Sequence, residues 1–298
     1  MISDNYTIIL FYKFIEIKNT DAFKIKQRKI AESFNLKGRM LIAKEGINAT
    51  FEGTAKNIKS YIKKLKKSSF TTGYGRTRQK IFKDVVFKES KGNGKAFTKL
   101  QLKVRPEVVT LGVGELNIKK ETARAITANE LDKMYAKKED FVVLDLRNDF
   151  EVQAGYFENT INPKLRHFRD LPQKIKELAH LKNKKIVAVC TGGIRCEKGT
   201  VLLKKEGFKN VYQLKDGIHT YIKKFPGKHF KGSLFVFDNR ITTPVVDSEN
   251  REIVGRCNYC NKECEDFYND DFFRPSKKVI CCDNCIALHS NLRRCIPA

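Results

Sequence analysis

The chain has 298 residues, of which 41% are hydrophobic, enough for two or three folded domains, and this composition excludes a wholly disordered protein. The net charge is strongly positive at +25, which favours a polyanionic partner such as nucleic acid, and nine cysteines in so long a chain do not resemble a small secreted disulfide scaffold. The sequence contains no apolar run of the roughly 18–20 residues that a membrane helix needs and no secretory leader pattern near Met1, so we expect a soluble cytosolic protein.

The first region predicts a β-α-β-β-α-β order, which is that of a ferredoxin-like (acylphosphatase-like) domain. We place this domain at residues 1–95 and an extended linker at 96–121. The predicted elements are a strand at Tyr6–Phe14, a helix at Asp21–Asn35, strands at Arg39–Ala43 and Ile47–Phe51, a helix capped by Thr54, and a strand at Ile81–Lys88.

Positive charge is concentrated in this part of the chain. Residues 1–120 hold 27 basic and 10 acidic residues, a net +17, whereas the remainder has a net +8. This distribution favours a polyanion-binding module joined to a chemical one. The alternative is an ordinary solvated surface.

The second region, residues 122–232, alternates strands with helices, which predicts a doubly wound α/β domain with a parallel sheet. Buried parallel strands appear in a sequence as continuous apolar runs, and two such runs are present, at Phe141–Leu146 and Lys185–Cys190. In chain order we predict a helix started by Thr127, a strand at Phe141–Leu146, a helix at Leu171–Leu181, a strand at Lys185–Cys190, a helix at Glu197–Glu206 ended by Gly207, a strand at Asn210–Leu214 and a helix at Ile218–Lys224. The third region, residues 233–298, starts with a strand at Leu234–Phe237 and becomes polar and cysteine-rich.

Cys190 is the candidate catalytic residue. It ends a buried strand and is followed by the loop Thr191, Gly192, Gly193, Ile194 and Arg195. Two glycines allow a tight turn with inward-facing N–H groups, and a helix N-terminus follows, so the thiol pKa should fall. The same loop would hold a persulfide, and we expect Arg195 to place a positive charge at its rim.

Two alternative interpretations of the Cys190 loop remain open. Cysteine phosphatases use a related loop with five residues between Cys and Arg, whereas this chain has four. The shorter ring leaves less room for a tetrahedral phosphate. The other alternative is an inert buried thiol beside a turn.

Four further residues could support this loop. Asp145, Arg147 and Glu151 follow a buried strand and could form a charge network, with a structural role more usual than a chemical one. Cys196 should lie on the first turn of the helix after the loop. It could form a disulfide with Cys190 during turnover, or simply pack.

Residues 122–232 resemble a rhodanese domain, through Asp145-x-Arg147 with Glu151, the Cys190 loop, and Leu214-Lys-Asp-Gly-Ile218. Rhodanese domains often carry glycine where Asp216 stands. Along almost the whole chain, the motifs also resemble the bacterial tRNA uridine(34) 5-hydroxylase family. These motifs are Lys37–Asn48, Val109–Gly112, Arg147–Asp149, Ile161–Pro163, Cys190–Lys198 and Phe235–Arg240.

This resemblance implies an oxidoreductase that hydroxylates the wobble uridine of tRNA to 5-hydroxyuridine, with molecular oxygen as co-substrate and Cys190 as a persulfide-type nucleophile. The sequence shows no flavin, haem or non-haem iron signature and does not identify the electron donor. A rhodanese-type sulfurtransferase is the alternative enzyme, and a non-catalytic RNA-binding protein is the alternative from another class.

A tRNA substrate would also account for the positive charge. Phe168 is a candidate platform for a splayed anticodon-loop base, with a core aromatic as the alternative. We expect six basic residues in family-like segments to contact the tRNA backbone: Arg39, Lys44, Lys103, Arg105, Arg166 and Arg169.

The cysteine-rich segment contains two Cys-x2-Cys pairs separated by 21 residues, Cys257 with Cys260 and Cys282 with Cys285. This spacing suits a tetrahedral structural zinc site. A segment with so few aliphatic residues needs a bound metal to stabilise its fold. Free packed thiols are the alternative. A second group could complete another site or substitute in the first: Cys264, Cys281, His289 and Cys295.

Overall fold

The computed structural model describes residues 5–71, 78–246 and 251–295 and divides into two compact units, Met1–Thr110 and Leu111–Ala298. The outer ends of the predicted first and last domains, residues 1–4 and 296–298, lie outside the described part. In the residues that are described, no helix has the length and apolar character needed to cross a membrane.

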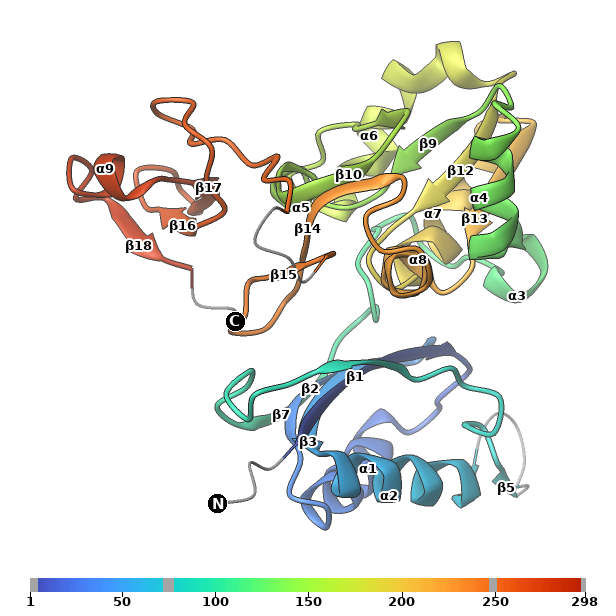
Figure 1. Cartoon of the computed structure of the whole chain (residues 1–298). Helices are drawn as coiled ribbons and strands as arrows, with labels where there is room; N and C mark the ends of the chain where they lie inside the picture. Colours follow the sequence, from blue (N-terminus) through green and yellow to red (C-terminus); the bar gives the residue numbers. More distant parts are fainter. Residues whose placement is uncertain (1–4, 72–77, 247–250, 296–298) are drawn as a thin grey trace. The chain divides into compact units, whose positions relative to one another are not determined.

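The first unit contains a five-stranded sheet in the order β6-β1-β3-β2-β7, with two helices along one face (Figure 1). Neighbouring strands of this sheet are antiparallel except β2 and β7, which are parallel. A two-stranded pair lies outside this sheet. The elements are β1 (Tyr6–Phe14), α1 (Thr20–Glu32), β2 (Lys37–Ala43), β3 (Gly46–Thr54), α2 (Ala55–Lys67), β4 (Phe70–Thr71), β5 (Arg78–Gln79), β6 (Lys88–Lys91) and β7 (Leu100–Val104).

Helix α2 begins as the sequence predicts, because the Thr54 hydroxyl accepts a hydrogen bond from the Asn57 N–H at 3.2 Å. The aromatic side chains of Phe11, Phe51 and Tyr61 meet in the core between sheet and helices. The sequence therefore encodes this layer through one apolar face on each element.

The strand predicted at Ile81–Lys88 is wrong for its first seven residues. Residues 81–84 form a turn, held by Lys83 N–H to Lys80 O and Val85 N–H to Phe82 O bonds, and β6 begins only at Lys88. Phe82 is fully buried against Phe11 and Phe70. The apolar side chains of this segment enter the core from a turn. In the sequence they form the same hydrophobic run that a buried strand would give, so the two cannot be distinguished there. The segment 96–121, predicted as an extended linker, contributes β7 to the first unit.

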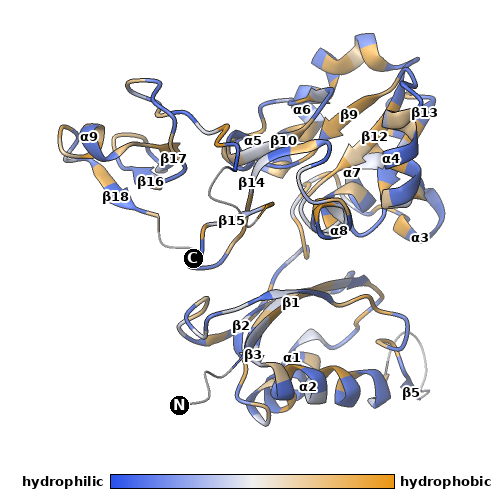
Figure 2. Cartoon of the chain, viewed as in Figure 1, coloured by the Kyte–Doolittle hydropathy of each residue, from blue (hydrophilic) through white to orange (hydrophobic). Residues whose placement is uncertain are grey.

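The second unit contains a five-stranded parallel sheet in the order β11-β9-β12-β13-β8, whose central strands β9 and β12 are largely hydrophobic in Figure 2. Helices cover both faces: α8 packs with α4 over one of them, and α7 packs on the other. The elements are α3 (Ile118–Glu121), β8 (Arg124–Ile126), α4 (Ala128–Ala136), β9 (Val142–Asp145), α5 (Asp149–Ala154), β10 (Gly155–Phe157), β11 (Thr160–Ile161), α6 (Leu171–Lys174), β12 (Lys185–Val189), α7 (Ile194–Lys205), β13 (Asn210–Leu214) and α8 (Gly217–Lys224).

Two predicted helices of this unit have different bounds. The predicted helix Leu171–Leu181 is α6 followed by a 3-10 segment, Ile175–Leu181. Helix α7 starts at Ile194 rather than Glu197, because Gly193 adopts a φ of +100° and reverses the chain directly after the loop. The loop at Cys190 is therefore shorter and tighter than predicted.

The remaining strands form two small antiparallel sheets, β10-β14-β15 and β17-β16-β18. Their elements are β14 (Phe230–Phe235), β15 (Thr242–Pro244), β16 (Phe267–Asp270), β17 (Lys277–Ile280), α9 (Asp283–Ile286) and β18 (Leu292–Arg294). The strand predicted at Leu234–Phe237 starts four residues earlier and ends at Phe235. Cysteine side chains take the place of aliphatic ones in the core of the last sheet.

Candidate active site and cysteine cluster

Cys190 lies directly after β12, at the carboxyl edge of the parallel sheet. Val189 pairs with Asp145 of β9, and the Leu146 N–H donates to the Val189 carbonyl at 2.9 Å. After β9 the chain adds β11 on one side of this strand, and it then crosses to add β12 and β13 on the other side. Cys190 therefore occupies the topological switch point, where α/β proteins place their ligands.

Backbone groups surround the Cys190 sulfur. The Gly193 N–H donates to Sγ at 3.1 Å, and the N–H groups of Arg195 and Cys196 also point to this sulfur. The first turn of α8 holds the loop from the other side, with Ile218 N–H to Cys190 O at 2.9 Å. This arrangement is a nest of amides at a helix N-terminus, as the glycine pattern predicts.

Gly217 is a site residue that the sequence analysis did not single out. Its φ is +73°, and a Cβ at this position would lie 2.6 Å from the Cys190 carbonyl and 2.7 Å from the Gly193 nitrogen. The preceding residue, Asp216, also has a positive φ of 62°, which explains why rhodanese domains often carry glycine there. The Asp216-Gly217 pair after β13 was the sequence signal from which this turn could have been predicted.

The surroundings lower the pKa of the Cys190 thiol to about 6. Burial opposes this shift because it disfavours the thiolate, and Cys190 is 0% exposed. The hydrogen bond from the Cys196 thiol, the positive charge of Arg195 and the backbone N–H groups together outweigh burial. Cys190 is therefore largely ionised at neutral pH, as a nucleophile requires.

Arg195 was predicted to place a positive charge at the rim of the loop. In the structure its side chain is instead buried and paired with Glu151. Its guanidinium donates to both carboxylate oxygens of Glu151 at 2.6 and 2.8 Å. It also donates to the Thr191 hydroxyl at 3.2 Å, and that hydroxyl donates to Glu151. Glu151 therefore holds the Arg195 guanidinium in place. The positive charge of Arg195 still lowers the pKa of Cys190.

Asp145 and Arg147 form a second buried pair beside the first. The Arg147 guanidinium donates to Asp145 at 2.6 and 3.0 Å, to the Gly155 carbonyl at 2.6 Å and to the Glu151 carbonyl at 3.3 Å. Both side chains are fully buried. The predicted network is present, and its bonds tie β9, α5 and β10 together without reaching the thiol.

Cys196 lies on the first turn of α7, in the position predicted from the sequence. Its thiol donates toward Cys190 and is fully buried. Burial and the adjacent Cys190 sulfur raise the pKa of Cys196 well above its usual value. Cys196 is therefore a hydrogen-bond donor to the thiolate rather than a second nucleophile in this state.

We expect the rate of Cys190 alkylation by iodoacetamide to rise with pH around a midpoint near 6 and to level off above pH 7. A lowered pKa means that the reactive thiolate already predominates above that midpoint, whereas an ordinary thiol would titrate near 8.5. Replacing Arg195 by glutamine should move the midpoint upward, and Arg195→Lys, which keeps the charge, should move it less. The measurement is labelling followed by mass spectrometry of the Cys190 peptide, and a wild-type midpoint above 8 would contradict the assignment.

The basic residues predicted to contact tRNA fall in both units. In the first unit, Arg39, Lys103 and Arg105 share the sheet face opposite the helices, because side chains alternate along β2 and β7. Lys44 is exposed in the turn after β2. In the second unit, Arg166 and Arg169 are exposed, whereas Phe168 between them is only 5% exposed. Phe168 is therefore a core aromatic and not a base platform.

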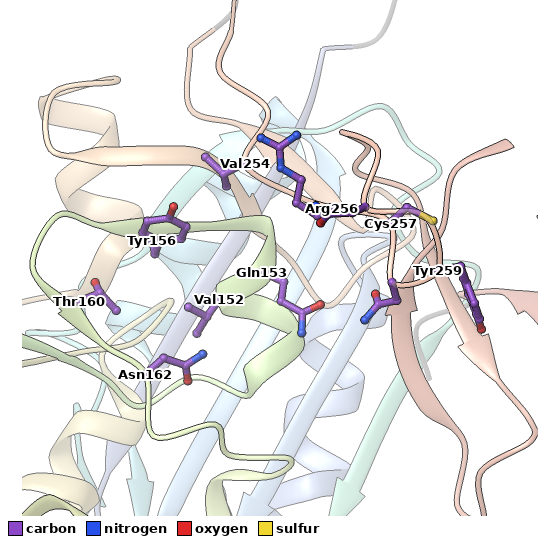
Figure 3. A pocket seen from close by; sticks show the side chains of 11 residues that line it. Val152, Gln153, Tyr156, Thr160, Asn162, Val254, Arg256, Cys257 and Tyr259 are labelled. Atoms are coloured by element: carbon purple, nitrogen blue, oxygen red, sulfur yellow. The ribbon is translucent and has the colours of Figure 1, made fainter. Parts of the chain in front are cut away.

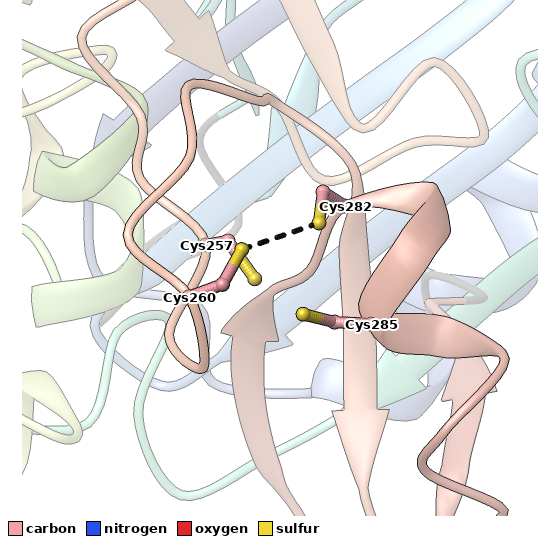
Figure 4. A group of neighbouring side chains, drawn as sticks. All are labelled: Cys257, Cys260, Cys282 and Cys285. Atoms are coloured by element: carbon pink, nitrogen blue, oxygen red, sulfur yellow. Dashed lines mark hydrogen bonds between the residues drawn. The ribbon is translucent and has the colours of Figure 1, made fainter.

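The four cysteines of the two Cys-x2-Cys pairs come together (Figure 4). The sulfur atoms of Cys257, Cys260, Cys282 and Cys285 all lie within 4.8 Å of one another, and those of Cys260 and Cys282 are 3.5 Å apart. A tetrahedral metal with bonds of about 2.3 Å to sulfur needs sulfur–sulfur separations of about 3.8 Å. This cluster could hold a metal ion. The other predicted ligands do not belong to it: Cys264, Cys281, His289 and Cys295.

A pocket of about 610 Å³ opens between α5 and the segment leading to the cysteine cluster (Figure 3). Tyr156 and Thr160 line one side, and Arg256 and Tyr259 line the other. Cys190 does not line it. This cavity is therefore separate from the candidate active site.

Family models match three parts of the chain. A UPF0176 acylphosphatase-like domain matches residues 6–108, a rhodanese-like domain matches residues 127–224, and a rhodanase C-terminal region matches residues 231–297. The first two confirm the acylphosphatase-like and rhodanese-like folds predicted from the sequence.

Curated relatives match almost the full length. A tRNA uridine(34) hydroxylase of Aster yellows witches'-broom phytoplasma is 38% identical over 94% of this chain and 88% of its own. Proteins of the same name from Bacillus cytotoxicus and Bacillus licheniformis are 37% and 36% identical, over 93% and 98% of this chain and 82% and 87% of their own. This chain belongs to the tRNA uridine(34) hydroxylase family.

Proposed function

We propose that this protein is a tRNA-modifying oxygenase that hydroxylates C5 of the wobble uridine, with the Cys190 sulfur as its nucleophile. One observation carries the proposal: a thiol with a pKa of about 6, held by backbone amides at the sheet's switch point. The chain keeps this arrangement within a family whose curated members bear the name tRNA uridine(34) hydroxylase.

The chemistry follows from what a thiolate does to a pyrimidine. Addition of the sulfur to C6 of uracil makes C5 electron-rich, and C5 then reacts with dioxygen. One oxygen atom stays on C5 and the other leaves as water, which consumes two electrons and two protons from a cellular reductant. Loss of the C5 proton to solvent, together with cleavage of the C6–S bond, restores the C5–C6 double bond and frees the Cys190 thiolate.

The buried position of Cys190 bears on which sulfur reacts. The side chain is 0% exposed, so a base reaching Sγ must enter the loop. A persulfide would place its terminal sulfur about 2 Å beyond Sγ, nearer to an incoming base. The amide nest stabilises either anion, so Cys190 serves as nucleophile in both forms.

The tRNA contacts in this proposal are the six basic residues named above. Those of the first unit share one sheet face or its adjoining turn, and those of the second unit lie in the segment just before α6. Contacts to phosphates release counterions, so affinity for tRNA should fall linearly with the logarithm of salt concentration.

A nucleoside analysis of tRNA from a deletion strain tests this function against its alternatives. Loss of 5-hydroxyuridine supports the hydroxylase, and its return on complementation assigns the activity to this chain. Loss of thiolated nucleosides would support a rhodanese-type sulfurtransferase, which needs only the Cys190 loop. An unchanged nucleoside profile would leave an RNA-binding protein without catalysis.

We also propose that the cysteine cluster binds one structural zinc ion. Protein purified without chelator should contain about one zinc per chain by elemental analysis. Cys282→Ser should lose the metal and destabilise the cysteine-rich segment, because three of the cluster cysteines, Cys257, Cys282 and Cys285, lie in its core. Cys264→Ser is the matched control, since Cys264 lies outside the cluster. Less than half a zinc per chain in the wild type would contradict the proposal.

A further inference from the structure

Two phenylalanines at the tip of the β16–β17 hairpin are exposed, and no element of the described residues covers them. Phe272 is 80% exposed, the largest fraction among the exposed large hydrophobic side chains of the described residues, and Phe273 is 43% exposed. Their ring centroids are 5.8 Å apart at an interplanar angle of 83°. Adjacent aromatics so exposed indicate a binding surface.

The hairpin tip is held in place by polar bonds rather than by a hydrophobic core. The buried Asp270 carboxylate accepts from the Phe272 N–H at 3.0 Å and from the Tyr259 hydroxyl at 3.1 Å. Asp271 accepts from Ser276 and from Arg293. The phenylalanines are thus presented on a fixed backbone, which lowers the entropy cost of binding.

Basic side chains lie close to the two rings. Residues 270–278 include Arg274, Lys277 and Lys278, and two carboxylates, Asp270 and Asp271, that accept hydrogen bonds from neighbouring donors. The Lys278 ammonium is bonded to Asn269 and Cys295. The Lys277 ammonium lies 5.6 Å from the Phe273 ring centroid. The Arg166 guanidinium, from the loop after β11, donates to the Pro275 carbonyl at 2.5 Å. The hairpin and a basic loop of the rhodanese-like domain therefore meet.

We propose that this tip, residues 272–278, is a stacking platform for unpaired bases of an RNA. Aromatic faces bind bases of any sequence, and adjacent cations bind the phosphates between them. An apolar protein partner would not need the adjacent cations Arg274 and Lys277, whereas a polyanion does. The identification of the RNA as tRNA rests on the function proposed above, and its anticodon loop offers unpaired bases.

The test is the affinity of the full-length protein for a fluorescent anticodon stem-loop at fixed salt. The double variant Phe272→Ala/Phe273→Ala should bind at least about tenfold more weakly, from the loss of base stacking. Its affinity for a blunt RNA duplex without unpaired bases should not change. Leu288→Ala is the matched control, because Leu288 is 79% exposed but lies outside the hairpin, and it should bind as the wild type does.

Unchanged affinity of the double variant for the stem-loop would overturn the platform. So would an equal loss for Leu288→Ala or for the duplex, and so would sedimentation showing that the wild type self-associates through these phenylalanines. An unchanged alkylation midpoint of Cys190 in the double variant shows that the rhodanese-like domain is still folded. Absence of 5-hydroxyuridine formation by the wild type would contradict the proposed function but leave the platform standing.

Discussion

Replacing Cys190 with alanine should reduce 5-hydroxyuridine formation by at least about 10³-fold, while leaving tRNA affinity within a few-fold of the wild type. The expected size reflects complete removal of the proposed nucleophile, for which no neighbouring group substitutes. Cys196 is the nearest thiol that the site brings to Cys190, and its raised pKa keeps it protonated. The measurement is single-turnover conversion of tRNA, followed by nucleoside mass spectrometry.

Cys196→Ala is the matched control for that experiment. It removes a donor to the thiolate, so the pKa of Cys190 should rise and activity near pH 6 should fall more than activity at pH 8. Activity at pH 8 should stay within about tenfold of the wild type. Equal loss in both variants would contradict a role for Cys196 limited to hydrogen bonding, and full activity of Cys190→Ala would remove the proposed nucleophile from the mechanism.

Replacing Arg147 with alanine should lower the free energy of unfolding by about 3–5 kcal/mol. The substitution leaves the carboxylate of Asp145 buried without its cation, and it removes the donor to the carbonyls of Glu151 and Gly155. Both members of the pair are fully buried, so water does not replace the lost bonds without a structural change. Urea unfolding monitored by circular dichroism measures the loss.

Lys184→Ala is the control for a charge pair of the same kind at the surface. Lys184 lies 2.9 Å from Asp140, and both side chains are about half exposed or more. Breaking an exposed pair changes the free energy of unfolding by about 0–1 kcal/mol. If Arg147→Ala cost no more than this control, the buried network would not be what fixes the ends of β9 and α5.

The position of Cys190 was predictable because its determinants are local. A continuous apolar run fixes β12, two glycines fix the turn after it, and the helix that follows supplies the N–H groups. Caps of the same local kind at Thr54 and Thr127 fix the starts of α2 and α4. Each of these signals lies within a few residues of the structure that it determines.

Features that depend on distant partners were not predictable. The sequence shows that Arg195 is positive but not that Glu151, 44 positions earlier, lies beneath it. An apolar run does not reveal whether it buries as a strand or as a turn, and the segment after Ile81 is a turn. Phe168 and Phe272 are chemically identical, and only the packing around them makes one buried and the other exposed.

The most direct measurement is the incorporation of labelled oxygen into tRNA by the purified protein under ¹⁸O₂, with and without Cys190. If the ionised sulfur directs dioxygen to C5, the wild type should yield 5-hydroxyuridine two mass units heavier at position 34, and Cys190→Ala should yield none. A hydroxyl that carries the isotope of the solvent water, or labelled product from Cys190→Ala, would contradict the mechanism.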